Sequence, residues 1–246
     1  MNRALCVMIG ALVAAPAAAN ESLDEILSCN YDTRGGYENI KDVDTARFEG
    51  TMTMGAMEAP FTMEFKRPEQ VRMEFEVQGM TAVQAYNGET GWSVMPFMGK
   101  TTPEEMAEDE IKNVKQMAEF DGPLIDWKEK GHELAYLGTE EVDGTEAYVI
   151  EVKRKDGDQE THYLDTDHCL TFKQKSRREI QGNEMRVATE LGNYKQVGGI
   201  VIPHSMTQIM GQGQDAPQQT IAIEESNIGV EIPEQRFEMP ETPAEG

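Results

Sequence analysis

Residues 48–77 alternate between apolar and polar side chains through three successive runs, and this alternation constrains the fold more than any other feature. The apolar or small positions are Phe48, Gly50, Met52 and Met54 in the first run, Phe61, Met63 and Phe65 in the second, and Val71, Met73, Phe75 and Val77 in the third. A period of two places successive side chains on opposite faces of a β-strand. The links at 57–60 and 67–70 are short and contain proline. The sequence therefore predicts an antiparallel meander with one apolar face that is rich in methionine.

The N-terminus predicts export. Residues 1–19 read MNRALCVMIGALVAAPAAA, with one basic residue, an apolar run and a final group of small residues. This pattern is typical of a secretory signal peptide, and its A-x-A motif predicts cleavage before Asn20. The apolar run is too short and too rich in alanine for a transmembrane helix, which needs about 20 apolar residues. We therefore expect a soluble protein of the bacterial periplasm.

The rest of the chain, residues 20–246, contains no linker rich in glycine, serine or proline, so we expect one domain with an extended C-terminal tail at 233–246. The chain has 45 Asp and Glu residues against 22 Lys and Arg residues, for a net charge of −23. Such a surface repels nucleic acid and anionic lipid headgroups, so neither is an expected partner. Arg72 alternates with the apolar residues and is expected on the solvent-facing side.

Two helical segments interrupt the strand pattern. Leu23, Ile26 and Leu27 have helical spacing near the start of the mature chain. Residues 102–118 begin with Thr-Pro-Glu-Glu, which resembles a helix start, and continue with an apolar stripe that includes Ile111, Val114 and Met117. Alternating runs resume after this segment, among them one that contains Ile150. We expect a mainly β protein with helices: about ten or eleven strands in a curved antiparallel sheet, with the helices on its concave side.

Cysteines, histidines and methionines leave several readings open. Export permits a disulfide between Cys29 and Cys169, but the sequence does not show whether they meet. Thioether sulfurs such as those of Met52, Met54 and Met57 suit Cu(I), so a copper-binding protein is an alternative function. His162, His168 and Cys169 are candidate zinc ligands, although a polar turn between two strands explains them better. No catalytic motif such as G-x-S-x-G or H-E-x-x-H occurs, so we expect no enzyme, metal or cofactor.

An ordered set of segments resembles the outer-membrane lipoprotein-sorting proteins of the LolA-like superfamily. These segments are RFEGTMTM, FKRPEQVRMEFEVQG, YNGETGW, LGTEEVDGTEAYVIEVKRKDG, THYLDT, YKQVGGIVIP and IPEQRFEMP. They cover essentially the whole mature chain. The resemblance implies an incomplete β-barrel closed by helices over an apolar cavity, and a periplasmic carrier of lipoprotein or lipid acyl chains that has no catalytic activity. It also implies a monomer whose partners include inner-membrane release and outer-membrane acceptor components.

Residue chemistry agrees with this resemblance, because methionine is flexible and polarizable and therefore suits a ligand without fixed shape. The expected cavity is lined by Phe48, Met52, Met54, Phe61, Met63, Phe65, Met73, Phe75, Val77, Trp92, Ile111, Val114, Met117 and Ile150. An ordinary close-packed core is the competing explanation for these residues. A sensor domain of the same fold, which detects mislocalised lipoproteins without carrying them, is the alternative function within this fold.

Overall fold

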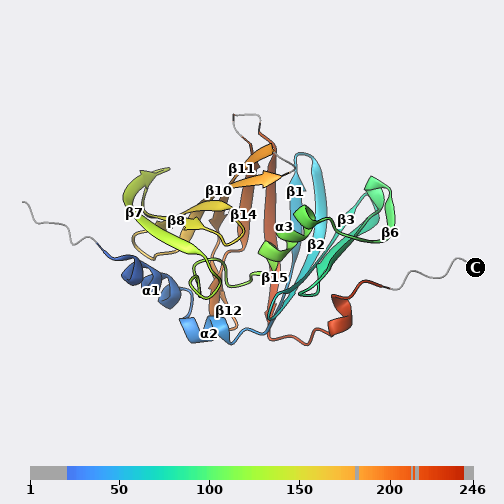
Figure 1. The fold of residues 1–246 in the computed structure, drawn as a ribbon, viewed down its shortest axis with the longest axis horizontal. Coiled ribbons are helices and arrows are strands. Elements are labelled where there is room, and N and C mark those ends of the chain that lie inside the picture. Colours follow the sequence, from blue (N-terminus) through green and yellow to red (C-terminus); the bar gives the residue numbers. More distant parts are fainter. Residues whose placement is uncertain (1–20, 181–182, 212, 214–215, 241–246) are drawn as a thin grey trace, which may run out of the picture.

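The computed structural model describes residues 21–180, 183–211, 213 and 216–240 (Figure 1). The expected signal peptide, 1–19, lies outside these residues. Within the described ranges, every helix is too short or too polar to span a lipid bilayer.

The helices of the described chain are α1 (Leu23–Thr33), α2 (Tyr37–Lys41) and α3 (Glu108–Ala118), with 3-10 turns η1 (Pro96–Met98) and η2 (Glu234–Arg236). The strands are β1 (Thr45–Met54), β2 (Met57–Lys66), β3 (Gln70–Val77), β4 (Met80–Tyr86), β5 (Gly91–Met95), β6 (Lys100–Glu105), β7 (Glu133–Val142), β8 (Thr145–Lys153), β9 (Gln159–Asp165), β10 (Thr171–Ile180), β11 (Asn183–Gly192), β12 (Lys195–Val197), β13 (Ile200–Ile202), β14 (Ser205–Met210) and β15 (Gln218–Ile228). The expected number of strands was too low, because short strands such as β12 and β13, and the edge strand β6, carry no clear periodic signal.

Thirteen of the strands form one antiparallel sheet in the order β6-β5-β4-β3-β2-β1-β15-β14-β11-β10-β9-β8-β7. Two meanders, β1–β6 and β7–β11, are joined in the middle by β14 and β15 (Figure 1). The sheet is not closed into a barrel, since β6 and β7 are its two ends. The segment between these two strands contains α3 and must therefore pass from one end of the sheet to the other. The expected curved, mainly β architecture is confirmed.

The start of the second helix was predicted wrongly. Residues 102–105 continue β6, where Glu105 pairs with Trp92 and Glu104 with Ser93. Because β6 is an edge strand, Pro103 interrupts no hydrogen-bond ladder on its outer side. The helix begins at Glu108, after Ala107, whose backbone N–H donates to the Glu110 carboxylate at 2.9 Å. Three acidic residues in the first turn then favour the helix N-terminus.

Helix α1 covers the sheet at β8 and β9. Its buried Ile26 and Leu27 pack in one core cluster with Ile150 and Leu164. Ser22 and Glu25 form a capping box that explains where the helix starts. A disulfide joins Cys29 of α1 to Cys169, with the two Cα atoms 5.8 Å apart, so the helix is covalently tied to the loop before β10.

The C-terminal segment covers the opposite, convex face at β2 to β5. Phe237 and Ile232 are buried there, and Arg236 contacts Glu64 at 2.8 Å. The expectation of an extended tail from residue 233 was therefore wrong for residues 233–237, which include η2. Phe237 is a single apolar residue four positions after Pro233, and one such residue is too short a pattern to predict this packing. Residues 241–246 lie outside the described chain.

Candidate apolar binding face

The candidate site is the apolar part of the concave sheet surface on the first three strands. We call this surface the methionine face, and its residues are Phe48, Met52, Phe61, Met63, Phe65, Met73, Phe75 and Val77. The strand register brings them together: Met63 pairs with Phe48 on one side and with Met73 on the other, and Phe61 pairs with Phe75. Because side chains alternate along each strand, all eight apolar side chains lie on one continuous surface.

Isoleucines extend this surface on its other side. Ile221 pairs with Met52, and Ile223 pairs with Gly50, beside a bulge in which Glu224 is the extra residue of β15. A Cβ atom at Gly50 would lie 2.0 Å from the Ala222 carbonyl oxygen, so glycine is needed at the bulge. Sequence reasoning missed these residues together with Ile200, Ile202 and Met206. The alternation of isoleucines 221 and 223 could have revealed β15, whereas the short β13 has no periodic signal.

Helix α3 packs on the sheet beside the methionine face. Val114 is buried in a cluster with Val71 and Tyr86, and Ile111 packs against the same cluster. A Cβ atom added at Gly91 of β5 would lie 3.1 Å from Ile111 Cγ1, which shows how closely the helix approaches the sheet. Thus the structure brings the predicted residues of α3, including Met117, to the same side of the sheet as the methionine face.

Phe120, just after α3, inserts its ring into the methionine face. The ring stacks on Phe48 at a centroid distance of 6.3 Å and an interplanar angle of 12°. It also contacts Phe65 at 5.6 Å in a tilted arrangement. The segment that bridges the open sheet therefore supplies the aromatic group that covers this apolar surface. Sequence reasoning missed Phe120 because it follows the end of the helical stripe.

The methionine face reaches solvent along the edge formed by the turns after β1, β3 and β5. Met54 and Met57 pair across the first turn and are each 41% exposed. Phe97 of η1 contacts Phe75 at a ring distance of 6.1 Å and is half exposed, and the neighbouring Met98 is 70% exposed. We call these four residues the apolar rim. Met54, predicted as a cavity residue, lies on this rim rather than among the buried residues.

Polar contacts hold the other side of α3. Lys112 donates to Asp158 at 2.5 Å, and Gln116 donates to the same carboxylate at 2.8 Å. After the helix, Glu119 accepts a hydrogen bond from Arg154 at 2.6 Å and forms an ion pair with Lys130. The helix and its following loop are therefore bound to the β8–β9 turn by hydrogen bonds and ion pairs, and to the sheet by apolar contacts.

The concave surface of β9 and β10 is polar, unlike the methionine face. The buried Glu160 carboxylate accepts hydrogen bonds from Arg154 at 2.5 Å and Gln174 at 2.9 Å, and lies 2.9 Å from His162 Nε2. Burial alone would raise the pKa of Glu160, but His162 and Arg154 together hold it at about 2. This fully partnered cluster is a structural ion network, and it bounds the apolar surface on the side of β9 and β10.

Two predicted cavity residues lie elsewhere. Trp92 pairs with Ala85 in the row of the sheet that contains Arg72, so its side chain is on the convex face. Its indole N–H donates to the Phe237 carbonyl at 2.8 Å, and Arg72 lies over its ring. The prediction that Trp92 lines the concave cavity was wrong, because its side chain packs on the convex face beneath the C-terminal segment. Ile150 is on the concave face, but α1 covers it.

Arg72 does point to the convex side, although it is largely covered there and pairs with Glu74 at 2.6 Å. The histidines and the cysteine considered as zinc ligands are not assembled. His162 is buried against Glu160, His168 is exposed, and Cys169 is in the disulfide. Among the described residues, no group of three or more His, Cys, Asp and Glu side chains is arranged to hold a metal ion.

An open antiparallel sheet whose apolar concave face is covered by a bridging helix and its loop is an incomplete-barrel fold. Three solved structures share the fold, each with a TM-score of 0.59. A LolA superfamily protein from Nitrosomonas europaea is 12% identical, covering 90% of this chain and 98% of its own. A domain assigned to outer membrane lipoprotein sorting from Vibrio parahaemolyticus is 11% identical, covering 86% and 95%. A DUF1329 family protein from Desulfovibrio piger is 15% identical, covering 86% and 97%.

This chain therefore has the LolA-like fold. No family model and no curated protein matches the sequence.

Proposed function

We propose that this protein is an exported carrier that binds the acyl chains of lipoproteins or lipids on the methionine face and delivers them to the outer membrane. The observation that carries the proposal is a continuous apolar surface that is covered by α3, its following loop and residues of α1 and α2, and reaches solvent at the apolar rim. The LolA-like fold supports this reading, and one structural neighbour is assigned to lipoprotein sorting. The proposed role needs no catalytic group.

The energetics fit such a ligand. Burial of an acyl chain contributes roughly 0.8 kcal/mol per methylene, so one chain can supply most of the binding free energy. Methionine side chains adapt to a flexible chain, because they are unbranched and have several rotatable bonds. The apolar part of the cover is small, since α3 contacts the sheet through small and medium side chains such as Val114 and Ala118, so its opening has to break chiefly the polar contacts with Asp158.

The disulfide between Cys29 and Cys169 supports an oxidising location, which fits the proposed periplasm. We further propose that the mature protein is the single domain 20–246. N-terminal sequencing of the exported protein should give Asn20 as its first residue. A mature chain that retains the first nineteen residues would contradict the proposed processing.

The first experiment identifies the ligand. Native mass spectrometry of the protein purified from its own periplasm should show an added mass that contains acyl chains. Transfer of this ligand to acceptor membranes would identify a carrier, whereas retention would favour a sensor of the same fold. The absence of any acyl-bearing species, together with no binding of an added fluorescent acyl probe, would contradict both functions.

The second experiment tests the methionine face with a matched pair of variants. Met63→Gln places an amide on this face, whereas Thr62→Gln places the same amide on the opposite side of β2. If two or three methylenes of the ligand contact Met63, the first variant should weaken acyl-probe binding by about 2 kcal/mol, or roughly 30-fold. The second should leave binding nearly unchanged. Equal effects of the two variants would show that the face is assigned wrongly.

A further inference from the structure

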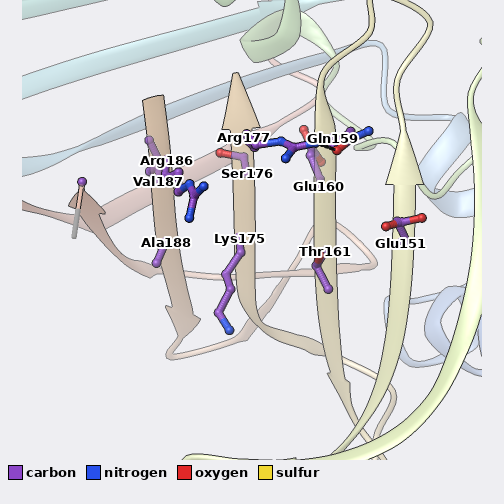
Figure 2. Close-up of a pocket in the computed structure, with 11 residues that line it drawn as sticks. Glu151, Gln159, Glu160, Thr161, Lys175, Ser176, Arg177, Arg186, Val187 and Ala188 are labelled. Carbon is purple, nitrogen blue, oxygen red and sulfur yellow. Dashed lines mark hydrogen bonds between the residues drawn. The ribbon is translucent and has the colours of Figure 1, made fainter. Parts of the chain in front are cut away.

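A hollow surface lies on the convex side of the sheet, over β8 to β11. Its volume is about 490 Å³, and Figure 2 shows the labelled lining residues on these four strands, to which Gly211 after β14 is added. The side chains that alternate away from the buried Glu160 are Glu151, Gln159, Thr161, Lys175, Arg177, Arg186 and Ala188. We call this surface the basic hollow. It lies opposite the concave surface and is separate from the methionine face.

Two arginines face each other directly in the basic hollow. Arg177 pairs with Arg186 across the β10–β11 ladder. Like charges at directly opposed positions destabilise a sheet, so this arrangement costs stability unless an anion lies between them. Among the described residues, the Glu184 carboxylate serves both: it lies 2.6 Å from Arg186 Nη2 and 3.8 Å from Arg177 Nη1. The pair therefore already binds an oxyanion, and one negative charge is shared between two guanidinium groups.

Other donors line the hollow beside this pair, although the Lys175 side chain runs away from the two arginines (Figure 2). Arg177 donates to the Gln159 side-chain oxygen, which leaves the amide nitrogen of Gln159 as a donor toward the surroundings. Lys175 lies over the Tyr163 ring and donates to its hydroxyl at 3.1 Å, so among the described residues its ammonium is held by a phenol rather than a carboxylate. Three cations thus gather in one hollow of a chain whose net charge is −23.

We propose that the basic hollow binds an oxyanion of the phosphate class. A guanidinium fork donates two parallel hydrogen bonds to phosphate, and two opposed forks can bind one phosphate from both sides. A ligand with one carboxylate would replace Glu184 by a group of the same charge, so the exchange would gain no electrostatic energy. A phosphate monoester or inorganic phosphate carries up to two charges at neutral pH, so its exchange for Glu184 is favourable. The phosphate comes from a soluble ion or from a lipid headgroup.

The test titrates the full mature protein with inorganic phosphate and follows backbone amide signals of β9 to β11 by NMR. Saturable shifts should appear at these strands and weaken as ionic strength rises. The variant Arg177→Gln/Arg186→Gln should bind phosphate at least about tenfold more weakly. The control Lys100→Gln/Lys195→Gln has the same net charge but leaves the hollow unchanged, and should bind within about twofold of the wild type. Arg186→Lys, which keeps the charge without the fork, should lie between them if the double variant fails to fold.

Vesicle flotation then separates the two sources of phosphate. Binding to vesicles that contain phosphatidic acid, whose headgroup is a phosphate monoester, would assign the site to a headgroup if the double variant loses it, and failure to bind these vesicles would assign the site to a soluble ion. The proposal is overturned if phosphate shifts do not saturate or if the arginine variants bind as well as the control. Saturable binding of an acidic peptide without phosphate binding would also overturn it. Because this site is on the other face, its failure leaves the proposed acyl carrier unaffected.

Discussion

Replacement of Phe120 by alanine should tighten acyl-chain binding while it destabilises the protein. The Phe120 ring lies on Phe48 and Phe65, two residues of the methionine face. A ligand on this face must displace the ring, so part of its binding free energy is lost in breaking these contacts. The Phe120→Ala variant removes that competition. An ordinary core residue would behave differently, because its loss would leave a cavity and improve nothing.

The magnitude follows from the contacts. Truncation of a fully buried phenylalanine costs about 3–5 kcal/mol, and each aromatic pair contributes about 0.5–1.5 kcal/mol beyond burial. Phe120 is only partly buried and forms two such pairs, so we expect a loss of about 2–3 kcal/mol in the free energy of unfolding. If half of this energy opposes the ligand, acyl-probe affinity should rise by roughly tenfold.

The assay measures both quantities on one sample. Urea unfolding gives the free energy of unfolding without ligand, and fluorescence titration with an acyl probe gives the dissociation constant. Added probe should then stabilise the variant more than the wild type at equal concentration, because stabilisation grows with the ratio of free ligand to dissociation constant.

Phe172→Ala is the matched control, since Phe172 is a partly buried aromatic residue that packs against the separate cluster around Val149 and Tyr163. It should lower stability and leave probe affinity unchanged. Weaker probe binding by Phe120→Ala, together with lower stability, would refute the reasoning, because Phe120 would then be part of the wall that contacts the ligand.

Three other predictions concern the covalent link, the helix and acid stability. Alkylation of the native protein without reductant should leave Cys29 and Cys169 unlabelled, and reduction should cost about 2–4 kcal/mol, since the bridge closes a long loop; full labelling would exclude the bridge. Hydrogen exchange should show residues 108–118 opening far more readily than 61–77, with protection changed by an acyl ligand; equal protection would indicate a rigid core. Glu160 has a folded-state pKa of about 2 against an ordinary 4.5, so its ionised form should contribute about 3 kcal/mol above pH 4.5, lost as the pH falls toward 2. Urea unfolding across this range should show that Glu160→Gln removes this part of the acid dependence, and an unchanged dependence would contradict the assignment.

The strands of the methionine face could be predicted because each has one apolar and one polar side, which is a strictly local signal. The face of Trp92 could not be predicted in the same way. Its strand, β5, is buried on both sides: α3 approaches Gly91, and the C-terminal segment covers Trp92. When both sides are covered, apolar character no longer indicates the concave side. The decisive partner, Phe237, lies 145 residues further along the chain.

The boundary between β6 and α3 shows a second limit. Thr102 and Pro103 have the chemistry of a helix start, yet backbone pairing with β5 holds 100–105 as a strand. Local preference is a weak prior that tertiary pairing routinely overrides. The apolar stripe itself, with Ile111 and Val114, was nevertheless predicted on the correct helix, because side-chain periodicity does not depend on where the helix starts.

The distribution of side chains within the concave core indicates where a ligand would be accommodated. On the β13 and β15 side the core is built from isoleucine, at positions 200, 202, 221 and 223, and a β-branched side chain has little rotamer freedom in a strand. On the β1–β3 side it is built from methionine and phenylalanine, and the neighbouring rim adds Met54 and Met57. One half of the same apolar layer is therefore stiff and the other adaptable. An ordinary core gains nothing from this asymmetry, whereas a ligand that enters from the rim and displaces Phe120 requires adaptable side chains on the half that it contacts.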